Sequence, residues 1–309
     1  MQSLIVQANA KINLGLEVTA LRPDGFHDIR TVMMKTRLSD EVTLALQPSL
    51  EPGRIEVMVS GLWAPEGESN IAHKAAAVYL ARAGYNCSSL PFDLLIQIRK
   101  AIPAGAGLGG GSSDAAATIT GLAALLHDAG SSPSFLSRRD MEPVAQGVGS
   151  DVPFFLSGPV CVAEGRGEKL TRVQSRCHLH VLLAKPAANL STKLVYQMYD
   201  VIGPGVRPDI PAVVQALSCG DTRSLQGAAN NDLERAATRL VPDIAGVIAL
   251  LAGLRPVCAG MTGSGSCAYA VFEDESEARR AHVEVSRSRR VSWSTLTESL
   301  SEEEHDHGA

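Results

Sequence analysis

Aromatic residues are scarce in this chain, and paired cysteines are absent. Phe, Trp and Tyr make up only 4% of the 309 residues, so the core must consist mainly of Leu, Val, Ile and Ala. The six cysteines include no C-x-x-C pair and are widely and irregularly spaced. This spacing argues against a zinc site or a disulfide framework and favours reduced thiols, as in a protein of the cytoplasm.

The sequence also lacks a long apolar run and an excess of basic residues. The longest apolar run, residues 244–254, is shorter than the roughly 20 residues that span a bilayer. We see no basic stretch followed by an apolar one that would indicate a signal peptide. With a net charge of −5, binding to nucleic acid or to a membrane surface is not expected. We expect a monomer or homodimer that acts on a small molecule.

Helix and strand patterns are mixed along the chain, and its length allows two domains. Strands are predicted by alternation of apolar and polar residues, and helices by Ala- and Leu-rich segments between capping signals. A break is predicted at residues 131–133. A short apolar run, 4–8, precedes the first predicted strand. The predicted strands are 10–16, 41–46, 55–59, 92–102, 181–185, 268–272 and 291–296, and the predicted helices are 71–83, 114–126, 192–199 and 275–285.

The most informative stretch is residues 102–117, IPAGAGLGGGSSDAAA. It lies between a predicted strand and a predicted helix, whose first turn Ser112 or Ser113 can cap. Glycines leave backbone N–H groups uncovered, and a helix N-terminus adds the positive end of its dipole. The stretch therefore predicts a binding site for a phosphate chain, whereas a flexible linker would not be set between a strand and a helix.

Three known phosphate loops can be compared with this stretch. A Walker A loop is excluded, because no Lys follows the glycines. The dinucleotide fingerprint G-x-G-x-x-G is matched by Gly105, Gly107 and Gly110, with Asp128 near the distance of a ribose-binding acid. That fingerprint arises easily by chance and gives no reason for Pro103. The third loop, P-x-x-x-G-L-G-(G)-S-S-x-A, accounts for Pro103 and for the serines that follow the glycines.

Other motifs flank this stretch. In A-K-I-N, Lys11 shares the polar face of a strand with Asn13, and a solvated strand face is the simpler reading of Lys11 alone. In G-S-D-V-P-F-F, Asp151 is either a helix N-cap or a chemical group. A turn, R-P-D-G-F-H, precedes an aromatic–histidine pair. Residues 230–234 begin a helix, and residues 262–265 form a second Gly/Ser loop.

Because A-K-I-N, the central loop and T-G-S-G occur together in this order, the chain resembles the galactokinase, homoserine kinase, mevalonate kinase and phosphomevalonate kinase superfamily. R-P-D-G-F-H, G-S-D-V-P-F-F, E-G-R-G-E and N-D-L-E extend the resemblance to the branch that phosphorylates a hydroxyl of a cytidine diphosphate-linked polyol in isoprenoid precursor biosynthesis. Phe26 and Met33 stand where that branch often has Tyr and an aromatic residue.

The resemblance implies an α+β fold of two domains with the active site in the cleft between them. The first, residues 1–168, is similar to ribosomal protein S5 domain 2 and binds ATP. The second, residues 169–300, is ferredoxin-like, and in one alternative its last strand returns to the first domain. Residues 301–309 are acidic and are predicted to be a disordered tail.

The resemblance also implies roles for residues in an ATP- and Mg²⁺-dependent reaction. Asp151 would accept the proton of the substrate hydroxyl, Lys11 would polarise that hydroxyl, and Ser112 would lie near Mg²⁺. Cytosine would stack between Phe26 and Tyr196. The residues implied for ATP are Asn70, Lys100, Pro103, Gly105, Gly107, Leu108, Gly109, Gly110, Gly111, Ser112 and Ser113, and those implied for the substrate are Asn13, Phe26, His27, Thr192, Tyr196, Gly263, Ser264 and Gly265.

Three other functions stay open on the sequence. One is another kinase of the superfamily, acting on mevalonate, homoserine or a sugar. The second is a regulator that binds a nucleotide without catalysis, although both Lys11 and Asp151 are present. The third is a dehydrogenase, which rests on the dinucleotide fingerprint alone.

Overall fold

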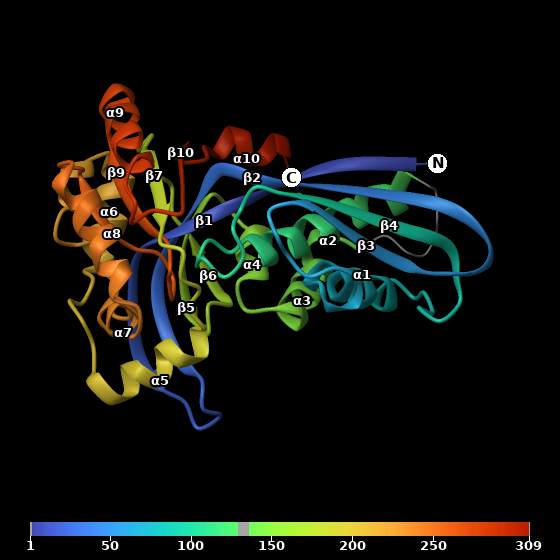
Figure 1. Cartoon of the computed structure of the whole chain (residues 1–309). Helices are drawn as coiled ribbons and strands as arrows, with labels where there is room; N and C mark the ends of the chain where they lie inside the picture. The colour runs from blue at the N-terminus through green and yellow to red at the C-terminus, as the bar shows by residue number, and fades with distance from the viewer. Residues whose placement is uncertain (1, 129–135, 309) are drawn as a thin grey trace.

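Two long antiparallel strands organise the N-terminal half of the computed structural model, which describes residues 2–128 and 136–308 (Figure 1). Strand β1 (Gln2–Leu21) pairs with β2 (His27–Gly53). On the other edge of β2, β4 (Leu90–Lys100) pairs with residues 41–53 and β5 (Val160–Gly165) with residues 29–34. Strands β3 (Ile55–Gly61) and β6 (Lys169–Arg172) complete the sheet beside β4 and β5.

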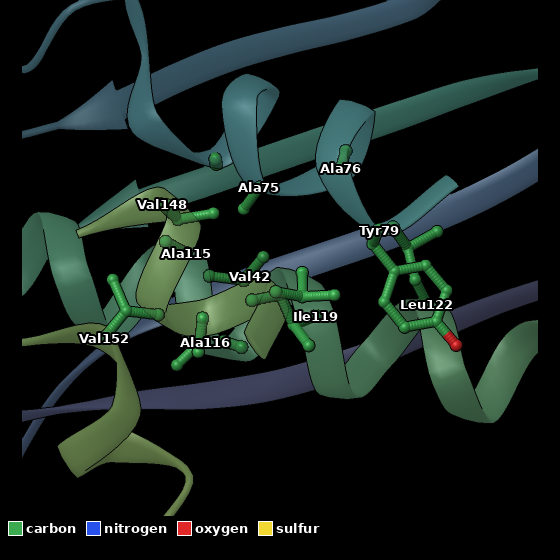
Figure 2. Close-up of a cluster of buried hydrophobic side chains, with 14 of the residues drawn as sticks. Val42, Ala75, Ala76, Tyr79, Ala115, Ala116, Ile119, Leu122, Val148 and Val152 are labelled. Atoms are coloured by element: carbon green, nitrogen blue, oxygen red, sulfur yellow. The ribbon is translucent and has the colours of Figure 1, made fainter. Parts of the chain in front are cut away.

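Helices α1 (Ile71–Arg82) and α2 (Gly110–Asp128) pack against this sheet, and α3 (Arg138–Val148) and α4 (Val152–Phe155) pack against these helices. Figure 2 shows small side chains of both helices in one buried cluster, Ala75 and Ala76 on α1 and Ala115 on α2. Small residues let helix axes approach closely, so this contact fixes the position of α2 over the sheet. The break predicted at residues 131–133 lies outside the described residues.

The C-terminal half is a four-stranded antiparallel sheet. Its strands β7 (His180–Lys185), β8 (Cys258–Met261), β9 (Ala268–Phe272) and β10 (Trp293–Glu298) lie in the order β10-β7-β9-β8. In chain order this is 4-1-3-2, with crossover helices α8 (Pro242–Gly253) and α9 (Glu275–Ser286) packed on one face. This is the ferredoxin-like arrangement, and it confirms the predicted α+β, two-domain fold.

The other face of the C-terminal sheet packs against the N-terminal domain. Its inward side chains, such as Val181 and Tyr269, form one core with Ile12 of β1 and Val213 of α6 (Ile210–Cys219). Helix α5 (Thr192–Ile202) lies against the turn between β1 and β2, on the lower side of Figure 1. Helix α7 (Glu234–Leu240) and the 3-10 turns Gly67–Ser69 and Thr222–Leu225 lie in the connections between these elements.

Two expectations about these elements are wrong, and a third holds only in part. The last strand, β10, pairs with β7 in the C-terminal sheet, and the residues just after it return to the N-terminal one, where Ser299 bridges Thr36 of β2. Residues predicted to be a disordered tail include helix α10 (Glu302–Gly308), because Arg37 pairs with Glu304 on it and His305 is buried. Helix α2 begins at Gly110, so Ser112 and Ser113 lie inside its first turn and do not cap it.

The dinucleotide-binding alternative is also wrong. It requires a strand–loop–helix–strand unit in a parallel sheet, whereas β4, which leads into the glycine loop, is antiparallel to β2 and parallel only to β3. The predicted domain boundary after residue 168 stays a prediction. Since β5 and β6 form a hairpin across it, the sheet favours a boundary after Arg172. Among the described residues, no helix is both long and apolar enough to cross a bilayer.

Candidate active site

A cavity of about 620 Å³ lies where the two domains meet. Its walls come from β1, β2, the glycine loop, α5 and the loop between β8 and β9. Residues predicted for catalysis and for the substrate gather here from positions more than 200 residues apart. The predicted residues that line it are Lys11, Asn13, Phe26, His27, Gly105, Gly107, Gly109, Asp151, Thr192, Tyr196, Gly263, Ser264 and Gly265.

Lys11 and Asp151 form an ion pair in this cavity, with 3.8 Å between Lys11 Nζ and Asp151 Oδ2. The Lys11 side chain is 5% exposed and that of Asp151 is 37% exposed. Burial lowers the pKa of Lys11, and the Asp151 carboxylate opposes that shift. Asp151 stands at the N-cap of α4, but its side chain makes no capping hydrogen bond. Its carboxylate is therefore open to a ligand, which favours the chemical reading of this residue.

The Asn13 side chain orients the lysine and links it to the second loop. Lys11 Nζ donates to Asn13 Oδ1 at 2.6 Å, and Asn13 Nδ2 donates to Thr31 Oγ1 at 2.8 Å. The backbone N–H of Asn13 donates to Thr262 Oγ1 at 3.0 Å. Thr31 and Thr262 were not predicted as site residues, because each acts only through a partner that is distant in sequence.

The glycine loop runs between this cavity and a second one. Gly105, Gly107 and Gly109 have φ of 66°, 78° and 72°, in the left-handed region that favours glycine. A Cβ on Gly109 would lie 2.8 Å from Phe155 Cζ and 3.0 Å from Lys11 Cγ. The loop therefore lies directly against β1 at Lys11. A cavity of about 370 Å³ follows the loop on its other side, and these three glycines border both cavities.

The second cavity is lined by all the residues predicted for ATP except Ser113, but two of them have structural partners. Asn70 caps α1 by accepting from Ala72 N at 2.9 Å and donates to Pro65 O at 2.7 Å. Lys100 is buried between two carboxylates, those of Asp40 and Asp114. Both side chains border the cavity, but their polar groups already bind other parts of the protein. The predicted contacts of Asn70 and Lys100 with ATP stay predictions.

A buried cluster of charges, Lys100 with Asp40 and Asp114, holds the segment of chain that leads into the glycine loop. Asp40 Oδ1 accepts from the backbone N–H groups of Ala101 at 2.6 Å and Ile102 at 2.9 Å. Burial raises the pKa of Asp114, and the Lys100 ammonium opposes the shift. The group ties β2, the end of β4 and the first turns of α2 together. Sequence reasoning missed it, because Asp40 lies 60 residues before its partner.

The two serines predicted near the phosphates point to different places. Ser112 is partly exposed and borders the second cavity beside the loop. Ser113 is 2% exposed and borders a separate cavity on the α10 side of the helix. The geometry therefore favours Ser112 over Ser113 as a ligand of the phosphates or their metal.

Aromatic and charged residues crowd the far end of the first cavity. His27 stacks on Tyr196 with 4.8 Å between ring centroids, and its Nε2 lies 2.7 Å from Asp200 Oδ1. The Arg166 guanidinium lies 4.2 Å from the centre of the Phe26 ring. Asp200 was missed, since a lone acid carries no sequence signal, and Arg166, although it lies in the E-G-R-G-E motif, was given no role. The predicted cytosine stack between Phe26 and Tyr196 stays a prediction.

Residues 230–234, whose role the sequence left open, hold the second Gly/Ser loop in place. Asn231 Nδ2 donates to Met261 O at 2.9 Å and to Gly263 O at 2.8 Å. Glu234 Oε2 accepts from Met261 N at 3.0 Å. Ser264 Oγ lies 2.8 Å from Thr192 Oγ1 at the start of α5. The loop is thereby closed over the cavity and over Gly107.

Comparison with known proteins shows to which family the chain belongs. Residues 70–159 match the family described as GHMP kinases N terminal domain, and residues 210–289 match GHMP kinases C terminal. The 4-diphosphocytidyl-2-C-methyl-D-erythritol kinase of Exiguobacterium sibiricum is 36% identical over 280 residues, which cover 91% of this chain and 93% of that protein.

Solved structures agree with the sequence matches. A crystal structure of 4-(cytidine 5'-diphospho)-2C-methyl-D-erythritol kinase superposes with a TM-score of 0.76 at 31% identity, over 96% of this chain and 99% of that one. Homoserine kinase from Cytophaga hutchinsonii superposes with a TM-score of 0.70 at 17% identity, over 97% and 95% of the two chains. The second likeness shows the shared fold alone.

Proposed function

This chain belongs to the GHMP kinase family, and we propose that within it the chain acts as a 4-diphosphocytidyl-2-C-methyl-D-erythritol kinase, which phosphorylates the 2-hydroxyl of that substrate in isoprenoid precursor biosynthesis. ATP is the co-substrate that the kinase family implies. We assign the loop cavity to ATP and the larger first cavity to the substrate on one observation. The two cavities meet at Gly105, Gly107 and Gly109, beside Lys11 and Asp151.

The reaction follows from this placement. The glycine loop and the start of α2 hold the phosphates of ATP, with its γ-phosphorus facing the first cavity. Asp151 accepts the proton of the substrate hydroxyl, whose oxygen forms a bond to that phosphorus while the bond to the ADP oxygen breaks. Lys11, charged and buried, holds the hydroxyl oxygen and balances the negative charge of Asp151.

The oxygen donors present also fit Mg²⁺, which favours hydroxyl, carboxylate and phosphate oxygens. Ser112 borders the loop cavity and would supply a hydroxyl beside the phosphates. The Asp114 carboxylate is held by Lys100 and is the poorer candidate. When bound with ATP, Mg²⁺ neutralises phosphate charge. The predicted cytoplasmic location and the choice between monomer and homodimer stay predictions.

A substrate panel tests the function. In a coupled ADP-release assay with ATP and Mg²⁺, 4-diphosphocytidyl-2-C-methyl-D-erythritol should have a kcat/KM roughly 10⁴-fold above that of mevalonate or homoserine, because polar groups built for one ligand are left unpaired by another. Turnover of mevalonate, homoserine or a sugar but not of the cytidine compound would assign the chain to another activity of the family. ATP binding without any turnover would support a regulator.

We expect the Asp200 carboxylate to strengthen binding of the cytosine base of the substrate through His27. A carboxylate accepts only, so His27 Nε2 donates in its hydrogen bond with Asp200, and this bond orients the ring with Nδ1 left for the base of the substrate. Asp200→Ala should raise the KM for the cytidine substrate by about 10-fold with little change in kcat. Asp221→Asn, a surface substitution, is the control. A fall in kcat at unchanged KM would contradict this role.

A further inference from the structure

Two histidines and a glutamate meet at the end of the C-terminal sheet, away from both cavities described above. His180 and Glu298 are directly opposed in the pairing of β7 with β10, and His178 precedes His180 by two residues. His178 Nε2 lies 3.5 Å from Glu298 Oε2, and His180 Nδ1 lies 3.6 Å from Glu298 Oε1. One nitrogen or oxygen of each residue lies within 4.8 Å of the other two.

The His180 side chain has an unmet need for a partner. It is only 10% exposed, and its Nδ1 is buried without a hydrogen bond. A buried imidazole nitrogen that faces a carboxylate at 3.6 Å is too far for a hydrogen bond but well placed for a shared ligand. This orphaned atom is a second indication, independent of the clustering, that something belongs between the two side chains.

The spacing fits a transition-metal ion. With metal–ligand bonds of about 2.1 Å, neighbouring ligand atoms of a tetrahedral site lie about 3.4 Å apart. The separations of His178 Nε2 and His180 Nδ1 from the Glu298 carboxylate, each to a different one of its two oxygens, are close to this value. Imidazole and carboxylate are ligands that suit Zn²⁺, Co²⁺ and Ni²⁺ rather than Mg²⁺. Since three protein ligands are present, water would complete the coordination.

One neighbouring charge competes for the site. Arg37 on β2 pairs with Glu298, which places a cation beside the carboxylate that the metal needs. Arg37 has an alternative partner, because its Nη2 also lies 2.7 Å from Glu304 Oε1 on α10. Glu298 can therefore turn to a metal while Arg37 stays paired with Glu304.

We propose that His178, His180 and Glu298 form a binding site for one divalent transition-metal ion of the Zn²⁺ class, which fastens the start of β7 to the end of β10. Next to this site, Leu38 N donates to Thr297 Oγ1 at 2.8 Å and Leu179 N to Ser299 Oγ at 3.0 Å. The ion thus stabilises the sheet at its contact with the N-terminal domain. This proposal does not depend on the kinase substrate.

The full-length protein, stripped of metal and free of nucleotide, should be titrated with Zn²⁺ by calorimetry and with Co²⁺ by visible absorption. We expect one ion per chain in the micromolar range, the visible bands of four-coordinate Co²⁺, and a higher Tm with Zn²⁺. The exposed ligand is the safest to remove: His178→Ala should weaken binding by roughly 10–100-fold and abolish the Tm increase without unfolding the protein.

Two matched controls locate the ion. His282→Ala on α9 removes a nearby histidine that is not one of the three proposed ligands, and His307→Ala removes a histidine from the C-terminal segment. Both should keep the wild-type affinity, whereas Glu298→Gln should weaken it. Unchanged affinity in His178→Ala, loss of binding in His307→Ala, or the absence of saturable binding to the wild type would each overturn the proposal.

Discussion

Asp151→Asn should lower kcat by about 10²–10⁴-fold while both KM values change little, because the amide keeps the shape of the side chain but cannot take the proton of the hydroxyl. The side chain makes no capping hydrogen bond, so its removal as a base should leave α4 folded. Initial rates of ADP release with saturating ATP and 4-diphosphocytidyl-2-C-methyl-D-erythritol measure the effect, and thermal unfolding checks the fold.

The same substitution has a pH signature. Asp151 opposes the lowering of the Lys11 pKa by burial, so its neutralisation should lower that pKa further. Lys11 would then lose its proton at a lower pH than in the wild type. The residual activity of the variant should therefore decline earlier on the alkaline side of the pH profile.

Asp209→Asn is the matched control, because Asp209 is also an N-cap aspartate and accepts from Ala212 N at 3.0 Å. It lies outside both cavities, so we expect activity within about twofold of the wild type, as for most surface substitutions. Full turnover in Asp151→Asn would keep the kinase assignment and remove Asp151 from the chemistry.

Gly107→Ala should reduce kcat/KM by on the order of 10²-fold, since a small displacement of reacting groups has this cost. A Cβ at this position would overlap the carbonyl oxygen of Thr262 and lie 3.2 Å from that of Gly265. The residue also has a φ of 78°, which an L side chain rarely adopts. The two loops would separate, and with them the phosphates and the substrate hydroxyl. Steady-state kinetics with both substrates varied will measure the loss.

Two other glycines separate the causes of this effect. Gly105→Ala introduces the same backbone strain, at a φ of 66°, but its Cβ meets nothing within 4 Å. Gly253→Ala at the end of α8 has neither strain nor a clash. We expect the loss of activity to rank Gly107 above Gly105, with Gly253 unaffected. Equal losses at Gly105 and Gly107 would show that contact between the loops is unimportant.

Local patterns were sufficient where a residue's role depends on its neighbours in the chain. Strand β9 has the predicted bounds, and α1, α5 and α9 begin at the predicted residues. The glycine loop between β4 and α2 was predicted for the same reason, because its backbone chemistry depends on consecutive glycines. Resemblance to a family supplied Lys11, Asp151 and the domain types, which no local pattern could have provided.

Prediction failed where distant segments decide the outcome. The acidic composition of residues 301–309 predicts disorder, but the structure has α10, held by Arg37 of β2. The sequence also gave no sign that the Lys100 ammonium pairs with Asp40, 60 residues before it, and with Asp114, and the predicted contact of Lys100 with ATP stays a prediction. In both cases a residue far along the chain supplies a charge that the local pattern does not show.

By itself, the sequence determined the strand–glycine loop–helix that can bind phosphates, and its resemblance to a family pointed to Lys11 and Asp151. Only the tertiary structure decided that Lys11 and Asp151 lie 3.8 Å apart, that Asn231 closes the second loop, and that Asp200 holds His27. The physical reason is that hydrogen bonds and ion pairs depend on distances of a few ångströms in space. Those distances are set by the packing of the two domains and not by separation along the chain.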